Sequence, residues 1–148
     1  MKVLIAYDTK YGNTKQVAEL IAEGIKTVES NEVDISHVNE VDLNKDILYD
    51  LIVIGSPNHM GTQTEKTRMF VKNLSKSPLK GNSFAVFDTY MSKDFEKAVK
   101  KSEKQITKKI PDMKKILPGL SIRVAGKKGP ILEEDLPKCK EFGISLTK

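Results

Sequence analysis

The stretch of residues 3–25 has the sequence VLIAYDTKYGNTKQVAELIAEGI. It begins with a continuous apolar run of strand length, Val3 to Ala6, and a polar turn with one glycine follows. After the turn, apolar residues recur at the three- and four-residue spacing of one buried helix face. These residues are Val17, Leu20, Ile21, Ile25 and Val28. The stretch therefore predicts a buried strand, a tight turn and an amphipathic helix.

The turn between this strand and this helix, Thr9 to Thr14, has the chemistry of an anion site. The first turn of a helix has free backbone N–H groups, and the helix dipole favours negative charge there. Thr9, Asn13 and Thr14 add hydroxyl and amide donors, and Gly12 lets the backbone approach a ligand closely. We predict that this segment binds a phosphate group, the alternative being a purely structural turn.

The same segment resembles a known motif. The run Thr9-Lys10-Tyr11-Gly12-Asn13-Thr14 is similar to the phosphate loop of the flavodoxin family, whose pattern is roughly T/S-x-T-G-x-T. The aromatic Tyr11 is more similar to the flavodoxin domains of flavodiiron proteins and to the flavodoxin-like quinone reductases. The resemblance implies that this loop holds the phosphate of FMN.

Length and composition bound the class of protein. A chain of 148 residues is expected to form one domain, 1–148, with a real core. Its apolar runs have strand length, so no membrane span is expected, and MKVLIAYD does not have the composition of a signal peptide. A single cysteine excludes an internal disulfide and a cysteine-based metal cluster. We expect a cytoplasmic protein without a metal.

The remaining chain alternates between strand and helix patterns. Further strands are expected at residues 32–38, 51–54, 83–87 and 120–125, and further helices begin near Thr62, Lys93 and Glu133. This alternation predicts an α/β fold with a doubly wound five-stranded parallel sheet. The flavodoxin-like order 2-1-3-4-5 is the common arrangement for a sheet of this size. The ligand crevice of such a sheet lies beyond the carboxyl ends of strands 1 and 3, where the winding reverses.

Local patterns give further expectations. Thr62 and Glu65 form a T-x-x-E capping box at the start of a helix. The helix from Lys93 to Ile110 is expected to bury Phe95, and Cys139 is expected to be an unreactive core residue. His37, at the end of the second strand, is expected to be exposed.

The loop after the third strand resembles a second flavodoxin motif. Its sequence GSPNHMG, residues 55–61, is similar to the G-[ST]-P-x-[aromatic]-x-G loop that lies beside the isoalloxazine ring in flavodoxin-fold flavoproteins. The residues that the resemblance places at the ring are Ser56, Pro57, Asn58, His59, Met60 and Gly61. It also implies that the Gly61 peptide rotates, so that its carbonyl accepts a hydrogen bond from N5 of the reduced flavin.

The loop after the fourth strand, DTYMS, is less similar to the family. Many flavodoxins have glycines there and an aromatic residue that stacks on the flavin, whereas this loop has no glycine. By resemblance, Asp88, Thr89 and Tyr90 contact the cofactor, and Tyr90 is its only aromatic residue that could stack.

Other classes that share this topology lack their motifs here. A phosphate-receiver domain needs an aspartate at the end of strand 3, where this chain has Gly55 and Ser56. A dinucleotide-binding domain needs G-x-G-x-x-G in the first turn, and only Gly12 is present. A hydrolase of this class needs the nucleophile motif G-x-S-x-G, which does not surround Ser56.

The resemblance therefore implies an FMN-binding electron carrier that shuttles electrons between redox proteins and has no catalytic residue of its own. The alternative is an FMN-dependent oxidoreductase of the NAD(P)H:quinone reductase or protoporphyrinogen oxidase type, and a chain that has lost its flavin also stays open. A net charge of +5 is unusual for flavodoxins, which tend to be acidic. The lysines between Lys93 and Lys109 are either a solvated helix face or a surface for acidic partners, such as a ferredoxin or a flavoprotein reductase. No nucleic-acid or membrane partner is expected, and the chain is a monomer or a homodimer.

Overall fold

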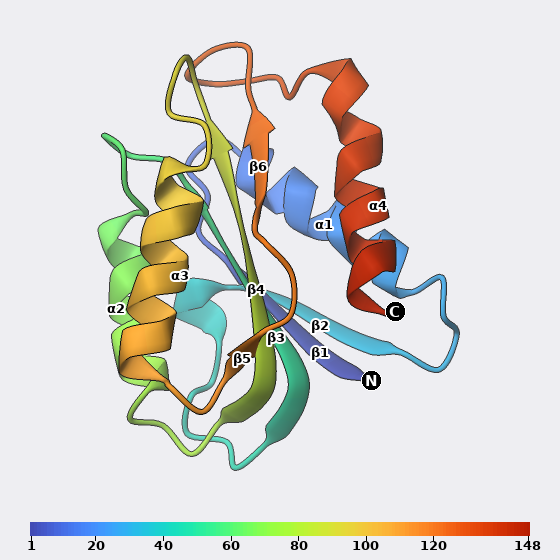
Figure 1. Ribbon diagram of the computed structural model, residues 1–148, viewed down its shortest axis with the longest axis vertical. Helices are drawn as coiled ribbons and strands as arrows, with labels where there is room; N and C mark the ends of the chain where they lie inside the picture. The colour runs from blue at the N-terminus through green and yellow to red at the C-terminus, as the bar shows by residue number, and fades with distance from the viewer.

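The computed structural model describes all 148 residues as three layers, with a parallel sheet between two pairs of helices (Figure 1). The long strands are β1 (Lys2–Tyr7), β2 (Glu32–His37), β3 (Leu48–Pro57) and β4 (Lys80–Tyr90), and β5 (Lys114–Lys115) and β6 (Leu120–Arg123) are short. Every strand pairing is parallel, and the order is β2-β1-β3-β4-β5 with β6 also paired to β4. The predicted fold class and strand order are confirmed.

The edge of the sheet beyond β4 differs from the prediction of one strand at residues 120–125. Two short strands occupy this position: β5 pairs with the first half of β4, and β6 pairs with its last residues. Pro118 lies between them, and proline has no N–H to donate to a strand ladder. The ladder is therefore interrupted there.

The helices cover both faces of the sheet (Figure 1). Helices α1 (Asn13–Ile25) and α4 (Leu136–Leu146) lie on one face, and α2 (Glu65–Leu74) and α3 (Lys97–Lys109) lie on the other. Two single 3₁₀ turns, η1 (Val38–Glu40) and η2 (Glu133–Asp135), follow β2 and precede α4. None of the helices combines the length and the apolar character that a membrane span requires.

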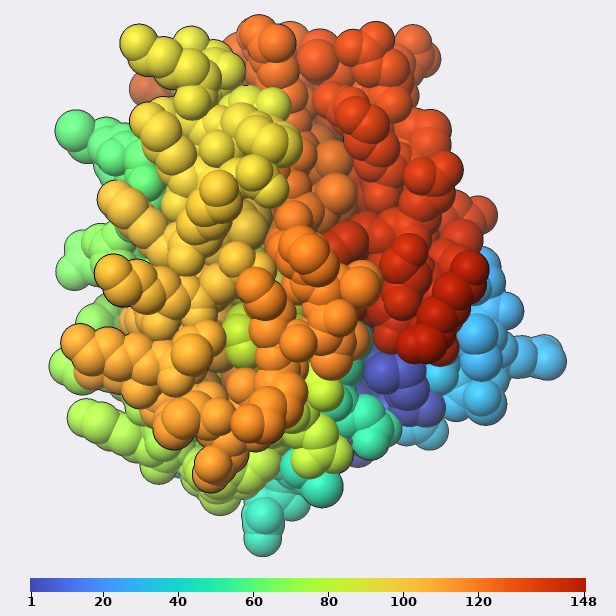
Figure 2. Space-filling view, viewed as in Figure 1, coloured from blue at the N-terminus to red at the C-terminus, as the bar shows by residue number.

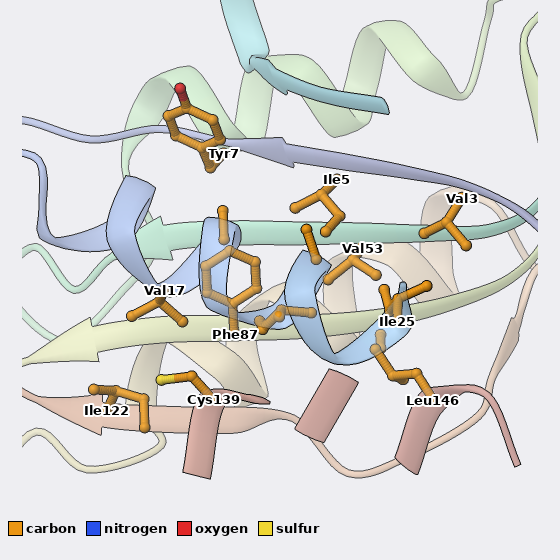
Figure 3. Packing of buried hydrophobic residues seen from close by; sticks show 14 of the residues in the cluster. Val3, Ile5, Tyr7, Val17, Ile25, Val53, Phe87, Ile122, Cys139 and Leu146 are labelled. Atoms are coloured by element: carbon orange, nitrogen blue, oxygen red, sulfur yellow. The ribbon is translucent and has the colours of Figure 1, made fainter. Parts of the chain in front are cut away.

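The core is divided by the sheet into two apolar clusters. Alternate residues of β4 supply both: Ala85 and Phe87 face α1 and α4, while Phe84 and Val86 face α2 and α3. Figure 3 shows the first cluster, in which the thiol of Cys139 lies among strand and helix side chains. Cys139 is fully buried, as predicted, and burial raises its pKa to about 12.

Four helix boundaries differ from the predictions. α4 begins at Leu136 and not near Glu133, because the 3₁₀ turn η2 occupies Glu133–Asp135. α1 ends at Ile25, and Val28 lies beyond it with 41% of its surface exposed. The Thr27 hydroxyl donates to the Gly24 carbonyl at 2.7 Å and so satisfies one acceptor at the helix end. The observed helix α1 is therefore shorter than the apolar pattern, which extends to Val28.

The cap of α2 is Thr64 and not the predicted Thr62. The Thr64 hydroxyl accepts from the Thr67 N–H at 3.3 Å, whereas the backbone of Thr62 pairs with His59. A residue held in that pairing is not placed to cap the helix. The T-x-x-E prediction is wrong by two residues.

α3 begins at Lys97, four residues later than predicted. The preceding Glu96 has a left-handed backbone with φ of 61°, and the first turn is capped from the sheet by Asp88, which accepts from the Val99 N–H at 3.0 Å. Phe95 therefore lies outside the helix. It is 56% exposed and not buried as predicted.

Candidate functional site

Three of the predicted site segments meet at the carboxyl edge of the sheet, at the top of Figure 1. They follow β1, β3 and β4, and the segment between β6 and α4 reaches the same edge. Because parallel strands all end on one side, loops that are distant in sequence become neighbours there. Contact between these residues and a flavin stays a prediction.

The β1–α1 loop presents backbone donors without acceptors. Gly12 has a φ of 93° and donates its N–H to the Thr9 hydroxyl at 2.9 Å. The N–H groups of Asn13, Thr14 and Lys15 donate to no protein acceptor, and the helical ladder starts with Gln16 donating to the Gly12 carbonyl. A Cβ at Gly12 would have no atom within 4 Å. Open space and free donors at a helix N-terminus fit a phosphate group.

Side chains of the same loop are partly available. Lys10 and Tyr11 are exposed, and the Lys10 ammonium lies 5.6 Å from the centre of the Tyr11 ring. Asn13 lies against Gly129 of the β6–α4 segment, where a Cβ would come within 2.5 Å of Asn13 Oδ1. No local pattern indicates that Gly129 borders this site, because 116 positions separate it from Asn13.

Thr14 connects the loop to the end of β4. Its hydroxyl lies 2.9 Å from the hydroxyl of Thr89, and both residues are buried. The Thr89 carbonyl in turn accepts from the Asn58 N–H at 2.7 Å. Thr89 therefore joins three predicted site segments through its side chain and its backbone.

The β3–α2 loop forms a tight hairpin. His59 and Thr62 pair through two backbone hydrogen bonds, and Met60 and Gly61 between them have φ values of 53° and 83°. Two positive φ values in succession are those of a type I′ turn, which glycine adopts without strain. Met60 stands at the tip and is 89% exposed. His59 is also exposed, so both side chains are available to a ligand.

Ser56 and Pro57 lie at the base of this loop. Ser56 is buried, and its hydroxyl accepts from the Thr64 N–H at 2.9 Å and donates to the Pro57 carbonyl. Pro57 is half-buried. The side chain of Ser56 thus holds the two ends of the loop together and has no free donor.

Asn58 has a buried acceptor without a partner. Its side-chain amide donates to Asp94 Oδ2 at 2.8 Å, which joins the β3–α2 and β4–α3 loops. Its Oδ1 is buried and accepts no hydrogen bond. Buried polar atoms in native proteins nearly always have a partner, so this oxygen fits a site for a donor on a ligand. Hydrogen bonds from Lys97 and Asn58 lower the pKa of Asp94.

Asp88 does not face the other site residues. It is fully buried and accepts from the Val99 N–H and, at 2.6 Å, from the Ser121 hydroxyl. Burial raises its pKa to about 6, against the opposing effect of these two hydrogen bonds. Its side chain is therefore directed to α3 and β6.

Tyr90 is half-buried at the end of β4. Its ring packs edge-on against Phe95, with 5.5 Å between the ring centres. Burial raises the pKa of Tyr90. The two aromatic rings lie beside the loops that the sequence placed at the flavin, and Phe95 was not among the predicted site residues.

Sequence reasoning also missed the partners of His37. We expected an exposed side chain, but His37 is half-buried and its Nε2 lies 3.1 Å from Asp8 Oδ1. Its ring packs edge-on against Tyr7. No sequence signal pairs residues 8 and 37, because parallel strands β1 and β2 bring them together.

Comparisons with known proteins show which family the chain resembles. A sequence model of the flavodoxin domain matches residues 4–126. A flavodoxin of Aquifex aeolicus (strain VF5) is 46% identical over 70 residues, and an NAD(P)H dehydrogenase (quinone) of Chromohalobacter salexigens is 29% identical over 90 residues. These matches cover 47% of this chain in each case and 37% and 45% of the two relatives, so the chain matches less than half of each relative's length.

The structural comparison extends over nearly the whole chain. A solved flavodoxin from the domain Archaea has a TM-score of 0.82 and 26% sequence identity, covering 99% of this chain and 96% of that one. Flavodoxins are FMN-binding proteins, which confirms the cofactor class expected from the sequence. The matching family model spans most of the sequence, and the chain belongs to the flavodoxin family.

Proposed function

We propose that the chain binds one FMN across the loops at the carboxyl edge, with the phosphate in the β1–α1 loop. The observation that carries this proposal is the row of free N–H groups at Asn13, Thr14 and Lys15 beside the open space at Gly12. Asn58 Oδ1 is buried and has no partner, which supports the proposal that a polar edge of the flavin ring lies near the β3–α2 loop. His59, Met60 and Tyr90 are the side chains that would contact the ring.

We further propose that the chain is an electron carrier. Bound FMN supplies one- and two-electron transfer, and the protein's part is to bind it, orient it and set the local charge. The site residues described above do this with backbone donors, amides and apolar side chains. Family membership supports this function, and a cytoplasmic location is part of the same proposal.

The distribution of charge supports acidic redox partners. Residues 93–115 contain nine lysines and four acidic residues, a net charge of +5 that equals the charge of the whole chain. The rest of the molecule is therefore neutral in sum. Figure 2 shows this segment in yellow and orange over one face, beside the β3–α2 loop in green. A one-sided positive field steers acidic proteins to that face.

Two measurements test this function. Titration of the purified chain with FMN and with FAD should show tighter binding of FMN, because the β1–α1 loop has free N–H donors for a terminal phosphate. FMN-loaded protein should then exchange electrons with a ferredoxin or a flavoprotein reductase. Preference for FAD, or binding of neither flavin, would overturn the proposal.

A second candidate function is NAD(P)H:quinone reduction. The similarity to the quinone dehydrogenase of Chromohalobacter salexigens favours it. The same FMN-loaded protein distinguishes the two, since a carrier turns over quinones with NAD(P)H negligibly. Turnover on the order of one per second or faster would instead assign the reductase function.

A further inference from the structure

A hydrogen-bonded cluster lies directly beneath the β1–α1 loop. Asp8, at the end of β1, is buried and accepts at both carboxylate oxygens. His37 Nε2 lies 3.1 Å from Oδ1, and the Thr64 hydroxyl donates to Oδ2 at 2.6 Å. The cluster therefore joins the ends of β1 and β2 to the first residue before α2.

The hydrogen bonds around His37 define which ring nitrogen has the proton. Its Nδ1 accepts from the Asn39 N–H at 3.1 Å, so Nδ1 has no proton of its own and the ring is neutral. The proton is then on Nε2, which donates to Asp8. The buried Asp8 carboxylate thus accepts one hydrogen bond at each oxygen, from His37 at Oδ1 and from Thr64 at Oδ2.

The cluster is linked to two of the loops proposed to hold the cofactor. Asp8 immediately precedes Thr9, whose hydroxyl accepts from the Gly12 N–H. Thr64 follows the hairpin at Met60 and Gly61 and donates its own N–H to Ser56. A displacement of Asp8 would therefore shift the β1–α1 loop, because Thr9 is the next residue in the chain. It would also shift the hairpin at Met60 and Gly61, because Thr64 donates to Asp8.

We propose that Asp8 and His37 are positioning residues that hold the β1–α1 loop in the arrangement that binds phosphate. This inference rests on the FMN binding proposed above. A buried carboxylate with both oxygens satisfied has one stable orientation, and it fixes the residue at which the loop begins. A loop ordered before binding loses less conformational entropy when the ligand arrives.

The experiment compares FMN with riboflavin, which lacks the phosphate. His37→Phe keeps a ring to pack against Tyr7 but removes the donor to Asp8. His37→Gln restores an N–H donor on a side chain of similar reach. Asp8→Asn is a second disruptive variant, because the amide has only one oxygen and can accept from His37 or from Thr64 but not from both. Urea unfolding of each flavin-free variant reports its stability separately.

His37→Phe and Asp8→Asn should weaken FMN binding about tenfold, the scale of one hydrogen bond to a charged group. Riboflavin binding should stay within about twofold, and His37→Gln should recover most of the FMN affinity. Equal losses for FMN and riboflavin, or no loss in either disruptive variant, would overturn the inference while leaving FMN binding intact. Wild-type protein that binds no FMN would overturn both proposals.

Discussion

The hydroxyls of Thr14 and Thr89 lie 2.9 Å apart, in a buried contact between the first turn of α1 and the end of β4. From the sequence, Thr14 was predicted to donate to a phosphate and Thr89 to lie near the flavin. In the structure they are neighbours, and each is the other's hydrogen-bond partner. The β1–α1 loop, which is predicted to bind phosphate, is therefore anchored to the strand that precedes the third predicted site loop.

Replacing Thr14 should affect stability as well as binding. Thr14→Val leaves the buried Thr89 hydroxyl without this partner, which should lower the free energy of unfolding by about 1–3 kcal/mol. Thr14→Ser keeps the hydroxyl and is the matched control. Urea unfolding of the flavin-free proteins measures the difference. Equal stabilities for the valine and serine variants would contradict the contact.

Gly12 should be essential for binding FMN. A β-branched residue at its φ of 93° is strained, and its side chain would fill the space in front of the free N–H groups. Gly12→Val, alone or with Thr14→Val, should abolish FMN binding. Binding is measured by the quenching of flavin fluorescence. Gly12→Asn separates the two effects, because asparagine tolerates positive φ but still fills the space. Asparagine should therefore preserve folding and weaken binding, and wild-type affinity in that variant would argue against a phosphate at this position.

The lysines of α3 should control association with acidic redox proteins. Lys101→Glu with Lys104→Glu reverses two exposed charges that form no ion pair. The association rate should fall about tenfold at low salt, and the difference should vanish as salt rises, because screening acts within about 10 Å at 0.1 M. Lys26→Glu with Lys140→Glu, on the α1–α4 face, gives the same net charge. If both pairs slow association equally, only net charge matters and the face has no special role.

Asp88 should make stability depend on pH. Its pKa in the folded protein, about 6, is above the ordinary value of 3.8, so the folded state holds more protons than the unfolded state between these pH values. The contribution of Asp88 is therefore most favourable at low pH and is lost as pH rises through about 6, by about 3 kcal/mol in total. Asp88→Asn should remove this slope from unfolding free energies measured between pH 4 and 7. Asp46→Asn, an exposed control, should leave the slope unchanged.

Cys139 should not react in the folded protein. The thiol is fully buried and its pKa is raised to about 12, so the reactive thiolate is scarce at neutral pH. Labelling with a thiol reagent at pH 8 should proceed only as fast as the chain opens, and completely in urea. Rapid labelling of folded protein would show that α4 separates from the sheet much more readily than its packing indicates.

The sequence alone determined the elements that short-range patterns encode. The apolar run at Val3 to Ala6 and the buried run at Leu51 to Ile54 are central strands because each is apolar on both faces. Their alternation with helices predicted the doubly wound sheet, and the strand order followed as the common arrangement for a sheet of this size. The turn between β1 and α1 could be located because glycine at a strand-to-helix turn is a local signal, and its binding of phosphate stays a prediction.

Tertiary structure decided which side chains form hydrogen bonds with residues that are distant in sequence. The start of α3 is set by Asp88 on β4, which no local pattern around Lys93 reveals, and the same contact turns Asp88 away from the other site residues. The partner of Thr14 lies 75 residues away, and His37 meets Asp8 only because β2 pairs with β1. Local periodicity records which residues are buried, but hydrogen-bond partners across the sheet are fixed only when the chain has folded.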